Sequence, residues 1–424
     1  MPGRRSVYEG TYEGRPVIIK VFSSRLHGQR HFKREVKGLE LLAQRNIPAP
    51  RLVMTGRNRD GWILVVEKIE PAEDVLTVYN RMSEPTETCS ILKPVFKQLA
   101  AMHTAGVLQK DLHLGNFLWD GETLYAMDPA QMRFESEPIN SSQSYCQLGN
   151  LATMFWGYDR SLKTELFDVY FKARGWTLNN SAFDQIEKFA ATARAHGLEH
   201  TLKKSLRTCT DFVRHTSATK SGVYDRSVFE GQDLTAFMEK IDDIMENGKI
   251  LKRGNSSLVS RIELNGHDTV VKRYNHKGHL HSLRHTIKGS RAKKCWLLGH
   301  RLCRLDIPTA KPLAFIEQRK NGFLYQSCLI TEYVEGQTLY QLLKDAEASD
   351  PSAKTALEQS NQLIQKLVDN GLTHADLKLS NILFTKTGPV LIDLDSMHRH
   401  RMHFILDFYA KKMITKFHRR LEDI

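Results

Sequence analysis

Two carboxylates and an amide stand at a chemically suggestive spacing near the end of the chain. Asp376 is followed by Asn381 five residues later, and Asp393 comes seventeen residues after Asp376, in the apolar stretch Pro389–Leu394. Phosphoryl transfer uses one carboxylate to accept the proton of the acceptor hydroxyl, while an amide and a second carboxylate hold Mg²⁺ against the nucleotide phosphates. The spacing predicts a catalytic loop with Asp376 as the base and a metal site at Asn381 and Asp393.

The same pattern occurs a second time, closer to the amino end. Asp111, Asn116 and Asp128 repeat both intervals. A single Asp–Asn pair is a weak signal, because both residues are common in polar turns. The two copies, however, share a preceding Gly-Val/Leu pair, an Asn-Phe/Ile-Leu tail, a turn and a following apolar strand. We interpret this as an internal duplication, with Asp111 as a second base and Asn116 and Asp128 as metal ligands.

A lysine interrupts an apolar strand upstream of the first copy. Lys20 lies inside the run VIIKVF, where a buried ammonium group needs an anionic partner. Glu35, in the predicted helix of residues 31–44, is the candidate partner. A Lys–Glu pair that grips the α- and β-phosphates of a nucleotide is the kinase arrangement.

The second copy has an equivalent lysine without an equivalent glutamate. Lys272 lies in the predicted strand DTVVKRY, but residues 272–304 contain ten basic residues and no acid. Two possibilities stay open at this point. Either the phosphates alone hold Lys272, or Glu317 or Glu335 replaces the missing glutamate.

The loop that would cover the nucleotide phosphates is short in both copies. In the second copy Gly254 and Ser256 lie between two predicted strands, where a backbone N–H and a hydroxyl can bind phosphate oxygens. In the first copy only Pro2-Gly3 precedes the predicted hairpin of residues 7–12 and 16–22. The first strand of that domain is therefore expected to be missing or to lie upstream.

Length and pattern predict two domains of the α+β class. A chain of 424 residues is long enough for two hydrophobic cores. We expect two tandem protein-kinase-like bilobal domains, each with a small antiparallel sheet and a helical lobe. The first spans residues 1–217 and the second, with a short helical lobe, spans residues 249–424. Residues 218–248 are predicted to form a linker and one short helix, because 217–231 are small, polar and contain glycine.

The charge is concentrated in the second half of the chain. Residues 1–250 carry 33 Lys and Arg against 31 Asp and Glu, whereas residues 251–424 carry 28 against 17. This excess fits an anionic substrate or a membrane surface, although a solvated helix face explains it equally well. The chain shows no nucleic-acid-binding motif, so nucleic acid is not an expected partner.

Other features favour a cytoplasmic protein. The six cysteines are scattered without a C-x-x-C pair, which suits a reducing compartment. No apolar run approaches the roughly 20 residues that span a bilayer, and the amino end lacks the apolar region of a signal peptide. Residues 401–421 predict a basic amphipathic helix. Its apolar face is expected to pack in the core rather than on a membrane, and comprises Phe404, Ile405, Phe408, Met413 and Phe417.

Several linked motifs resemble one enzyme family. Lys272-Arg-Tyr, the run Ser290–Phe315, THADLKLSNIL and VLIDLD resemble the bacterial lipopolysaccharide core kinases (the Kdo/heptose, or WaaP-type, kinases). Residues 16–128 are similar to a second, more diverged kinase-like unit, as in tandem proteins of this type in Gram-negative bacteria. The resemblance covers most of residues 252–397.

The resemblance implies ATP- and Mg²⁺-dependent phosphorylation of a sugar hydroxyl, on heptose or Kdo, of the lipopolysaccharide inner core. The substrate would be a lipid A–core glycolipid, met in peripheral contact with the cytoplasmic face of the inner membrane. By the same resemblance Asp376 is the catalytic base, Asn381 and Asp393 are the metal ligands, and Lys272 contacts the phosphates.

Two alternatives remain. The chain could be a Ser/Thr protein kinase, but no activation segment or Ala-Pro-Glu follows Asp128 or Asp393. One or both units could instead be pseudokinases that act as a scaffold or regulator.

His374, two residues before Asp376, is expected to support the catalytic loop structurally.

Overall fold

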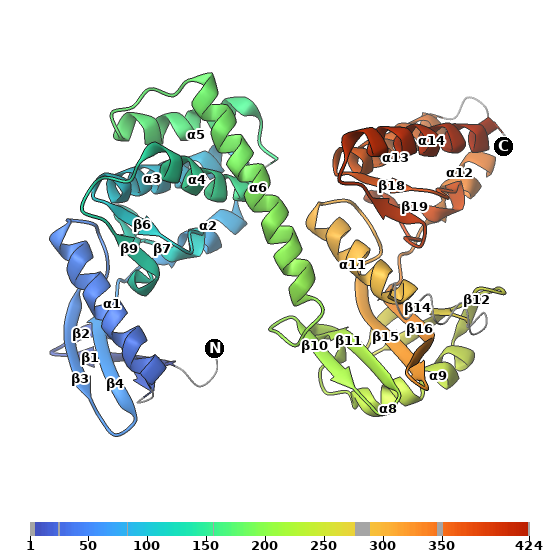
Figure 1. The fold of residues 1–424 in the computed structure, drawn as a ribbon, viewed down its shortest axis with the longest axis horizontal. Helices are drawn as coiled ribbons and strands as arrows, with labels where there is room; N and C mark the ends of the chain where they lie inside the picture. Colours follow the sequence, from blue (N-terminus) through green and yellow to red (C-terminus); the bar gives the residue numbers. More distant parts are fainter. Residues whose placement is uncertain are drawn as a thin grey trace. The chain divides into compact units, whose positions relative to one another are not determined.

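The chain separates into two compact units, Met1–Gly197 (unit 1) and Leu198–Ile424 (unit 2), shown in the computed structural model of Figure 1. Both units are mixed α+β structures built on antiparallel sheets. The structure describes residues 5–23, 26–82, 84–155, 157–275, 289–345 and 351–422.

Unit 1 begins with a four-stranded sheet in the order β1-β2-β4-β3. Its strands are β1 (Arg5–Tyr12), β2 (Arg15–Ser23), β3 (Leu52–Arg57) and β4 (Gly61–Glu67). The predicted hairpin of β1 and β2 is confirmed. Its turn residues Glu13 and Gly14 both have positive φ angles, as a two-residue hairpin turn requires. Helix α1 (Leu26–Gln44) lies against this sheet (Figure 1). Its side chains Phe32 and Leu39 are buried in a core shared with the sheet.

The remainder of unit 1 is mainly helical and has a separate core. Phe96, Leu99, Phe155 and Phe167 are buried in it. Short strand pairs at its edge carry the predicted catalytic loop. The elements are β5 (Glu73–Asp74), α2 (Val75–Arg81), α3 (Pro85–Thr104), β6 (Val107–Gln109), η1 (Leu114–Asn116), β7 (Phe117–Trp119), β8 (Leu124–Ala126), η2 (Pro129–Gln131), β9 (Met132–Phe134), α4 (Ser141–Ala152), η3 (Thr153–Phe155), α5 (Arg160–Ala173) and α6 (Asn180–Lys204), which continues into unit 2.

Unit 2 contains a seven-stranded sheet in the order β10-β11-β15-β16-β14-β13-β12. Alternate side chains of its strands serve two different cores, because successive residues of a strand point to opposite faces. Val223 and Phe315 lie in one core, together with Trp296 of α11. Tyr224 and Ile316 lie in the other core, which the sheet forms with α8 and α9. The elements are β10 (Phe212–Thr216), β11 (Lys220–Asp225), α7 (Arg226–Phe229), α8 (Leu234–Glu239), α9 (Ile241–Asn247), β12 (Lys249–Arg253), β13 (Ser257–Leu264), β14 (His267–Tyr274), α11 (Arg291–Arg304), β15 (Pro312–Lys320) and β16 (Phe323–Glu332).

The last part of unit 2 repeats the element order that carries the loop of unit 1. A three-stranded sheet β17-β19-β20 and a strand pair β18-β21 correspond in order to β5-β7-β8 and β6-β9. The elements are β17 (Gln337–Thr338), α12 (Leu339–Asp345), α13 (Pro351–Asp369), β18 (Leu372–His374), η4 (Leu379–Asn381), β19 (Ile382–Thr385), β20 (Gly388–Leu391), β21 (Met397–Arg399) and α14 (His403–Glu422).

The predicted linker at residues 218–248 is wrong. Strand β11 pairs with β15, and Val223 and Tyr224 are buried. The residues predicted as one short helix form α8 and α9 instead, and Met238 and Met245 of these helices are buried. Polar turns between short elements give this segment the composition of a linker, while a few apolar side chains fix it to the sheet.

The predicted apolar face of the carboxyl-terminal helix is also wrong. In α14 Met413 and Phe417 are buried, but Phe404 and Phe408 are exposed. At 100° per residue Phe404 and Met413 lie on opposite sides of the helix, so they cannot share one face. Among the described residues no helix is both long and apolar enough to cross a membrane.

Two buried histidines make the stability of both units depend on pH. Burial lowers the pKa of His103 in unit 1 and of His300 in unit 2 from 6.5 to about 4. At a pH between about 4 and 6.5, these two histidines bind protons in the unfolded chain but not in the folded chain. Stability should therefore fall as the pH falls from 6.5 toward 4, by about 1.4 kcal/mol per pH unit for each histidine.

Thermal unfolding followed by circular dichroism over this pH range tests the prediction. His300→Phe should flatten the pH dependence of the unit 2 transition and leave that of unit 1 unchanged. If the unit 2 transition of this variant kept the pH dependence of the wild type, His300 would not be a source of that dependence.

Candidate active site

A short 3₁₀ turn fixes the predicted catalytic loop of unit 1. Turn η1 ends at Asn116, whose side-chain Nδ2 donates to the backbone oxygen of Asp111 at 2.7 Å. The backbone N–H of Met127 donates to the oxygen of Asn116 at 2.8 Å. These bonds tie the loop to the segment that delivers Asp128, so the three predicted residues belong to one small region.

Unit 2 repeats this arrangement with its own residues. Turn η4 ends at Asn381, whose Nδ2 donates to the backbone oxygen of Asp376 at 3.4 Å. The backbone N–H of Ile392, directly before Asp393, donates to the oxygen of Asn381 at 3.0 Å. The second triplet is therefore also brought together.

A side chain two residues before each aspartate supports its loop. In unit 2 His374 is buried, and its Nε2–H donates to the backbone oxygen of Asp393 at 2.7 Å. Burial lowers the pKa of this histidine, which keeps it neutral. In unit 1 the equivalent position, two residues before Asp111, is Gln109. Its Nε2 donates to the backbone oxygen of Met127 at 3.5 Å. The expected structural role of His374 agrees with this geometry.

Lys20 and Glu35 form the ion pair that the sequence predicts. Glu35 is buried, and Arg5 also approaches its carboxylate at 3.5 Å. Helix α1 lies close to the segment that follows Asp128, because a Cβ atom at Gly38 would come within 2.7 Å of the backbone oxygen of Pro129. Glycine at this position permits that approach.

Asp128 carries the electrostatic features of a cation ligand. Its backbone is in the left-handed region with φ 54°, a conformation that is uncommon outside glycine. Burial, followed by the negative charge of Glu35, raises the pKa of its carboxyl group. A bound cation would offset both effects.

A pocket of about 240 Å³ opens beside these groups in unit 1. Lys20 and Asp128 line its polar side, and Ile18, Val66 and Leu118 contribute apolar surface. Glu67, the last residue of β4, and the following Lys68 and Ile69 also line the pocket. A pocket lined by apolar side chains together with a lysine and a carboxylate suits a nucleotide.

Lys272 has a different pair of partners in unit 2. Its Nζ lies 3.0 Å from Asp393 Oδ1 and 2.9 Å from Asp395 Oδ2. Among the ion pairs of the described residues, Lys272 pairs with neither Glu317 nor Glu335, so the structure does not support the alternative in which one of them replaces the missing glutamate. Burial lowers the pKa of Lys272, but the charges of Asp395 and Asp393 outweigh it and raise the pKa overall.

Asp395 is a site residue that the sequence analysis missed. The hydroxyl of Tyr274 donates to its Oδ1 at 2.5 Å and the thiol of Cys295 does so at 3.1 Å. Burial raises the pKa of Asp395, but Lys272 and these bonds hold it below its usual value. The available signal was its position two residues after Asp393, and the backbone N–H of Asp395 donates to Asp393 Oδ1 at 3.1 Å, in a turn that keeps the two residues close together.

The unit 2 pocket around Lys272 is much smaller, at about 20 Å³. It includes Asp393 and Asp395, but Gly254 and Ser256 do not line it. Their backbone oxygens accept hydrogen bonds from Asn275 at the end of β14, at 3.3 and 3.1 Å. The structure thus does not bring the predicted phosphate loop to the lysine.

Two cations flank Asp376. Arg420 of α14 approaches its carboxylate at 2.6 Å and Lys378 does so at 3.4 Å. Burial raises the pKa of Asp376, but the hydrogen bond from Arg420 and the charges of Lys378 and Arg420 lower it below the usual value. The carboxylate is therefore held ionised, as a proton acceptor must be.

Comparison with known protein families agrees with this geometry. The model of the lipopolysaccharide kinase (Kdo/WaaP) family matches residues 5–133 and 236–423. The chain belongs to this family. It is a kinase, and its family implies ATP as a substrate. No curated protein matches the chain.

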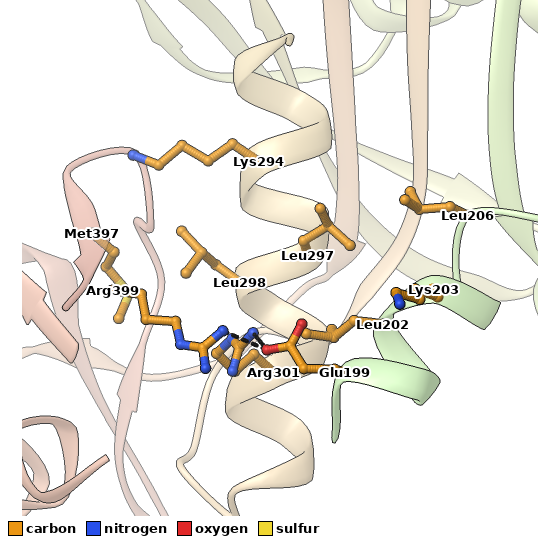
Figure 2. Close-up of a pocket in the computed structure, with 10 residues that line it drawn as sticks. All are labelled: Glu199, Leu202, Lys203, Leu206, Lys294, Leu297, Leu298, Arg301, Met397 and Arg399. Atoms are coloured by element: carbon orange, nitrogen blue, oxygen red, sulfur yellow. Dashed lines mark hydrogen bonds and ion pairs between the residues drawn. The ribbon is translucent and has the colours of Figure 1, made fainter. Parts of the chain in front are cut away.

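A second pocket of this kinase, of about 350 Å³, contains none of the predicted residues (Figure 2). Arg301 and Arg399 converge on Glu199, with Arg301 at 2.7 Å. Lys294 lines the same pocket and donates to the backbone oxygen of Asp395 at 2.9 Å. The charged groups of this pocket thus mainly bind one another and the backbone at Asp395.

The carboxylate of Asp395 should stabilise unit 2. Asp395→Asn removes one of the two charges that hold Lys272 and weakens the bonds from Tyr274 and Cys295, so we expect a loss of about 1–3 kcal/mol in the free energy of unfolding. Denaturant unfolding measures it, with the exposed Glu335→Gln as the control. Equal stability of the two variants would contradict the pairing.

Arg420 should set the acidic limit of activity. Arg420→Gln removes a group that lowers the pKa of Asp376, so the carboxylate should protonate at higher pH. The acidic limb of the kcat/KM profile for ATP-dependent phosphorylation should move to higher pH. Arg419→Gln, next to it on α14 and exposed, is the matched control and should leave the limb in place. A shift in both variants, or in neither, would contradict the role.

Proposed function

We propose that the protein transfers the γ-phosphate of ATP to a sugar hydroxyl, on heptose or Kdo, of the lipopolysaccharide inner core. One observation carries the proposal. In a chain of this kinase family, the Asn381–Asp376 hydrogen bond and the Lys272–Asp393 ion pair of unit 2 support assigning these groups to one site. The acceptor class follows from the family description and from the basic second half of the chain.

Each group has a proposed task in unit 2. Asp376 accepts the proton of the sugar hydroxyl, and Lys272 binds nucleotide phosphates once its aspartate partners release it. Asn381 and Asp393 would hold Mg²⁺, which shields the charge on the transferred phosphate. The donor set fits this ion, because Mg²⁺ prefers carboxylate and amide oxygens together with phosphates and water. The amide of Asn381 uses its nitrogen in the bond to Asp376, which leaves its oxygen for the metal.

We further propose that the chain is a tandem of two protein-kinase-like bilobal domains. The repeated element order and the repeated Asn–Asp bond support it. In unit 1 the corresponding groups are Lys20 and Glu35 for the phosphates, Asp111 as base, and Asn116 and Asp128 for Mg²⁺. The described sheet of unit 1 has four strands, whereas unit 2 has the order β12-β13-β14-β16-β15 with β11 and β10 added at one edge.

The acceptor is proposed to be a lipid A–core glycolipid at the cytoplasmic face of the inner membrane. Its core carries phosphate and carboxylate groups, which match the net positive charge of residues 251–424. Lys378 and Arg420 beside Asp376 provide cations where such a substrate would enter.

A second candidate function is that of a regulator in which unit 2 is a pseudokinase. One observation favours it. Both aspartates near Lys272 are already paired with it, and the pocket there is only about 20 Å³. In that case unit 1, with its larger pocket, would bind the nucleotide.

Phosphorylation assays with ATP, Mg²⁺ and dephosphorylated core oligosaccharide separate these functions. Asp376→Asn should lower turnover by at least about 10²–10³-fold, because it removes the base. Asp111→Asn tests unit 1 in the same assay, and the exposed Asp243→Asn is the control. Loss of activity in Asp111→Asn alone would assign catalysis to unit 1. Transfer to protein instead of core would favour a Ser/Thr protein kinase, and no transfer to either acceptor would contradict the proposal.

A further inference from the structure

Helix α14 carries large apolar side chains on its solvent side. Its buried face consists of Leu406, Ala410, Met413 and Phe417. Phe404 is 69% exposed and Phe408, one turn later, is 64% exposed. Tyr409, whose ring contacts that of Phe408, is 43% exposed. We name Phe404, Phe408 and Tyr409 the aromatic patch. Clustered exposed apolar groups of this size usually mark an interaction site.

Ring contacts order part of the aromatic patch. Phe408 packs edge-on against Tyr409 with ring centroids 5.3 Å apart. Tyr409 stacks on His400 at 5.1 Å, and His400 is hydrogen-bonded to Thr373 at 2.7 Å. The patch is therefore attached to the strand pair β18-β21, and its rings are held on the surface rather than turned inward.

Positive charge accompanies these rings. Residues 401–422 contain six Lys and Arg against two Asp and Glu. Arg401, Lys411, Lys412 and Arg419 are exposed. At 100° per residue Lys411 and Lys412 project on the same side of α14 as Phe404 and Phe408. Within the described part of the chain neither lysine forms an ion pair, so both are available to an anionic partner.

We propose that α14 docks on an anionic lipid bilayer through the aromatic patch and these lysines. Aromatic side chains favour the boundary between headgroups and acyl chains, and lysines beside them bind lipid phosphates. The helix lies along the surface, because its opposite face is occupied by the core of unit 2.

A bilayer fits this surface better than the other occupants do. A second copy would place its own lysines against these, and like charges repel across an interface. A purely acidic protein surface would match the lysines but leave two phenylalanines in contact with polar groups. An anionic bilayer supplies negative charge and an apolar layer at adjacent depths.

Docking would hold unit 2, which carries the catalytic loop, at the membrane surface. Arg420, which pairs with Asp376, follows Phe408 by twelve residues on the same helix, or about 18 Å along its axis. This consequence rests on the proposed function, since it matters only if the acceptor is a membrane glycolipid. The docking surface itself rests on α14 alone.

Vesicle co-sedimentation of the full chain tests the proposal. The probes are vesicles of phosphatidylcholine with phosphatidylglycerol and vesicles of phosphatidylcholine alone. The protein should bind the anionic vesicles and dissociate as salt is added. The double variant Lys411→Gln/Lys412→Gln should lower the partition coefficient by about 30-fold, at about 1 kcal/mol per lysine. Phe404→Ser/Phe408→Ser should lower it by more than about 10-fold.

The control removes aromatic groups of comparable exposure elsewhere in unit 2. Phe323 is 50% exposed and Tyr340 is 43% exposed, and Phe323→Ser/Tyr340→Ser should bind as the wild type does. All variants should keep the wild-type Tm, because the replaced side chains lie outside the core. Equal binding to both kinds of vesicle, unchanged binding of the α14 variants, no binding, or a lipid-free dimer that Phe404→Ser/Phe408→Ser dissolves would each overturn the proposal. Because no ATP and no core sugar are present, these results do not bear on the kinase assay.

Discussion

A lysine ammonium placed within an apolar strand must have a carboxylate beside it, and this requirement shapes both units. An unpaired buried charge costs several kcal/mol. In unit 1 this carboxylate is Glu35 of helix α1, which forms an ion pair with Lys20. In unit 2 the carboxylates are Asp393 and Asp395, which follow strand β20. The same residue type in the same strand position thus acquires a partner from a different element.

The two units differ both in the partner of the lysine and in the space beside it. In unit 1 the glutamate holds Lys20 from the helix side, and a pocket of about 240 Å³ is left between the lysine, β4 and Asp128. In unit 2 the aspartates hold Lys272 against the metal-site segment, and about 20 Å³ remains. A nucleotide entering unit 2 has to replace these contacts with its phosphates. The catalytic loops are nevertheless fixed by the same Asn-to-Asp bond in both units.

Local features of the fold and site could be predicted from the sequence, whereas tertiary partners could not. The strands of Lys20 and Lys272, helix α1, and the convergence of each Asp–Asn–Asp triplet follow from spacing and alternation. Asp395 was missed because its role depends on a contact with Lys272 across 123 positions of the chain, which no local pattern encodes. Strand β11 was taken for a linker because only Val223 and Tyr224 reveal its burial. The face of α14 was misassigned because its apolar residues were grouped without regard to the rotation between Phe404 and Met413.

Calorimetric titration of Mg²⁺–ATP into the full chain tests most directly the claim that these buried lysines bind nucleotide phosphates. The account predicts that Lys20→Met removes the binding of unit 1 and that Lys272→Met removes the binding of unit 2, where the phosphates must first displace Asp393 and Asp395 from the lysine. Binding of Mg²⁺–ATP that is unchanged in both variants would contradict it.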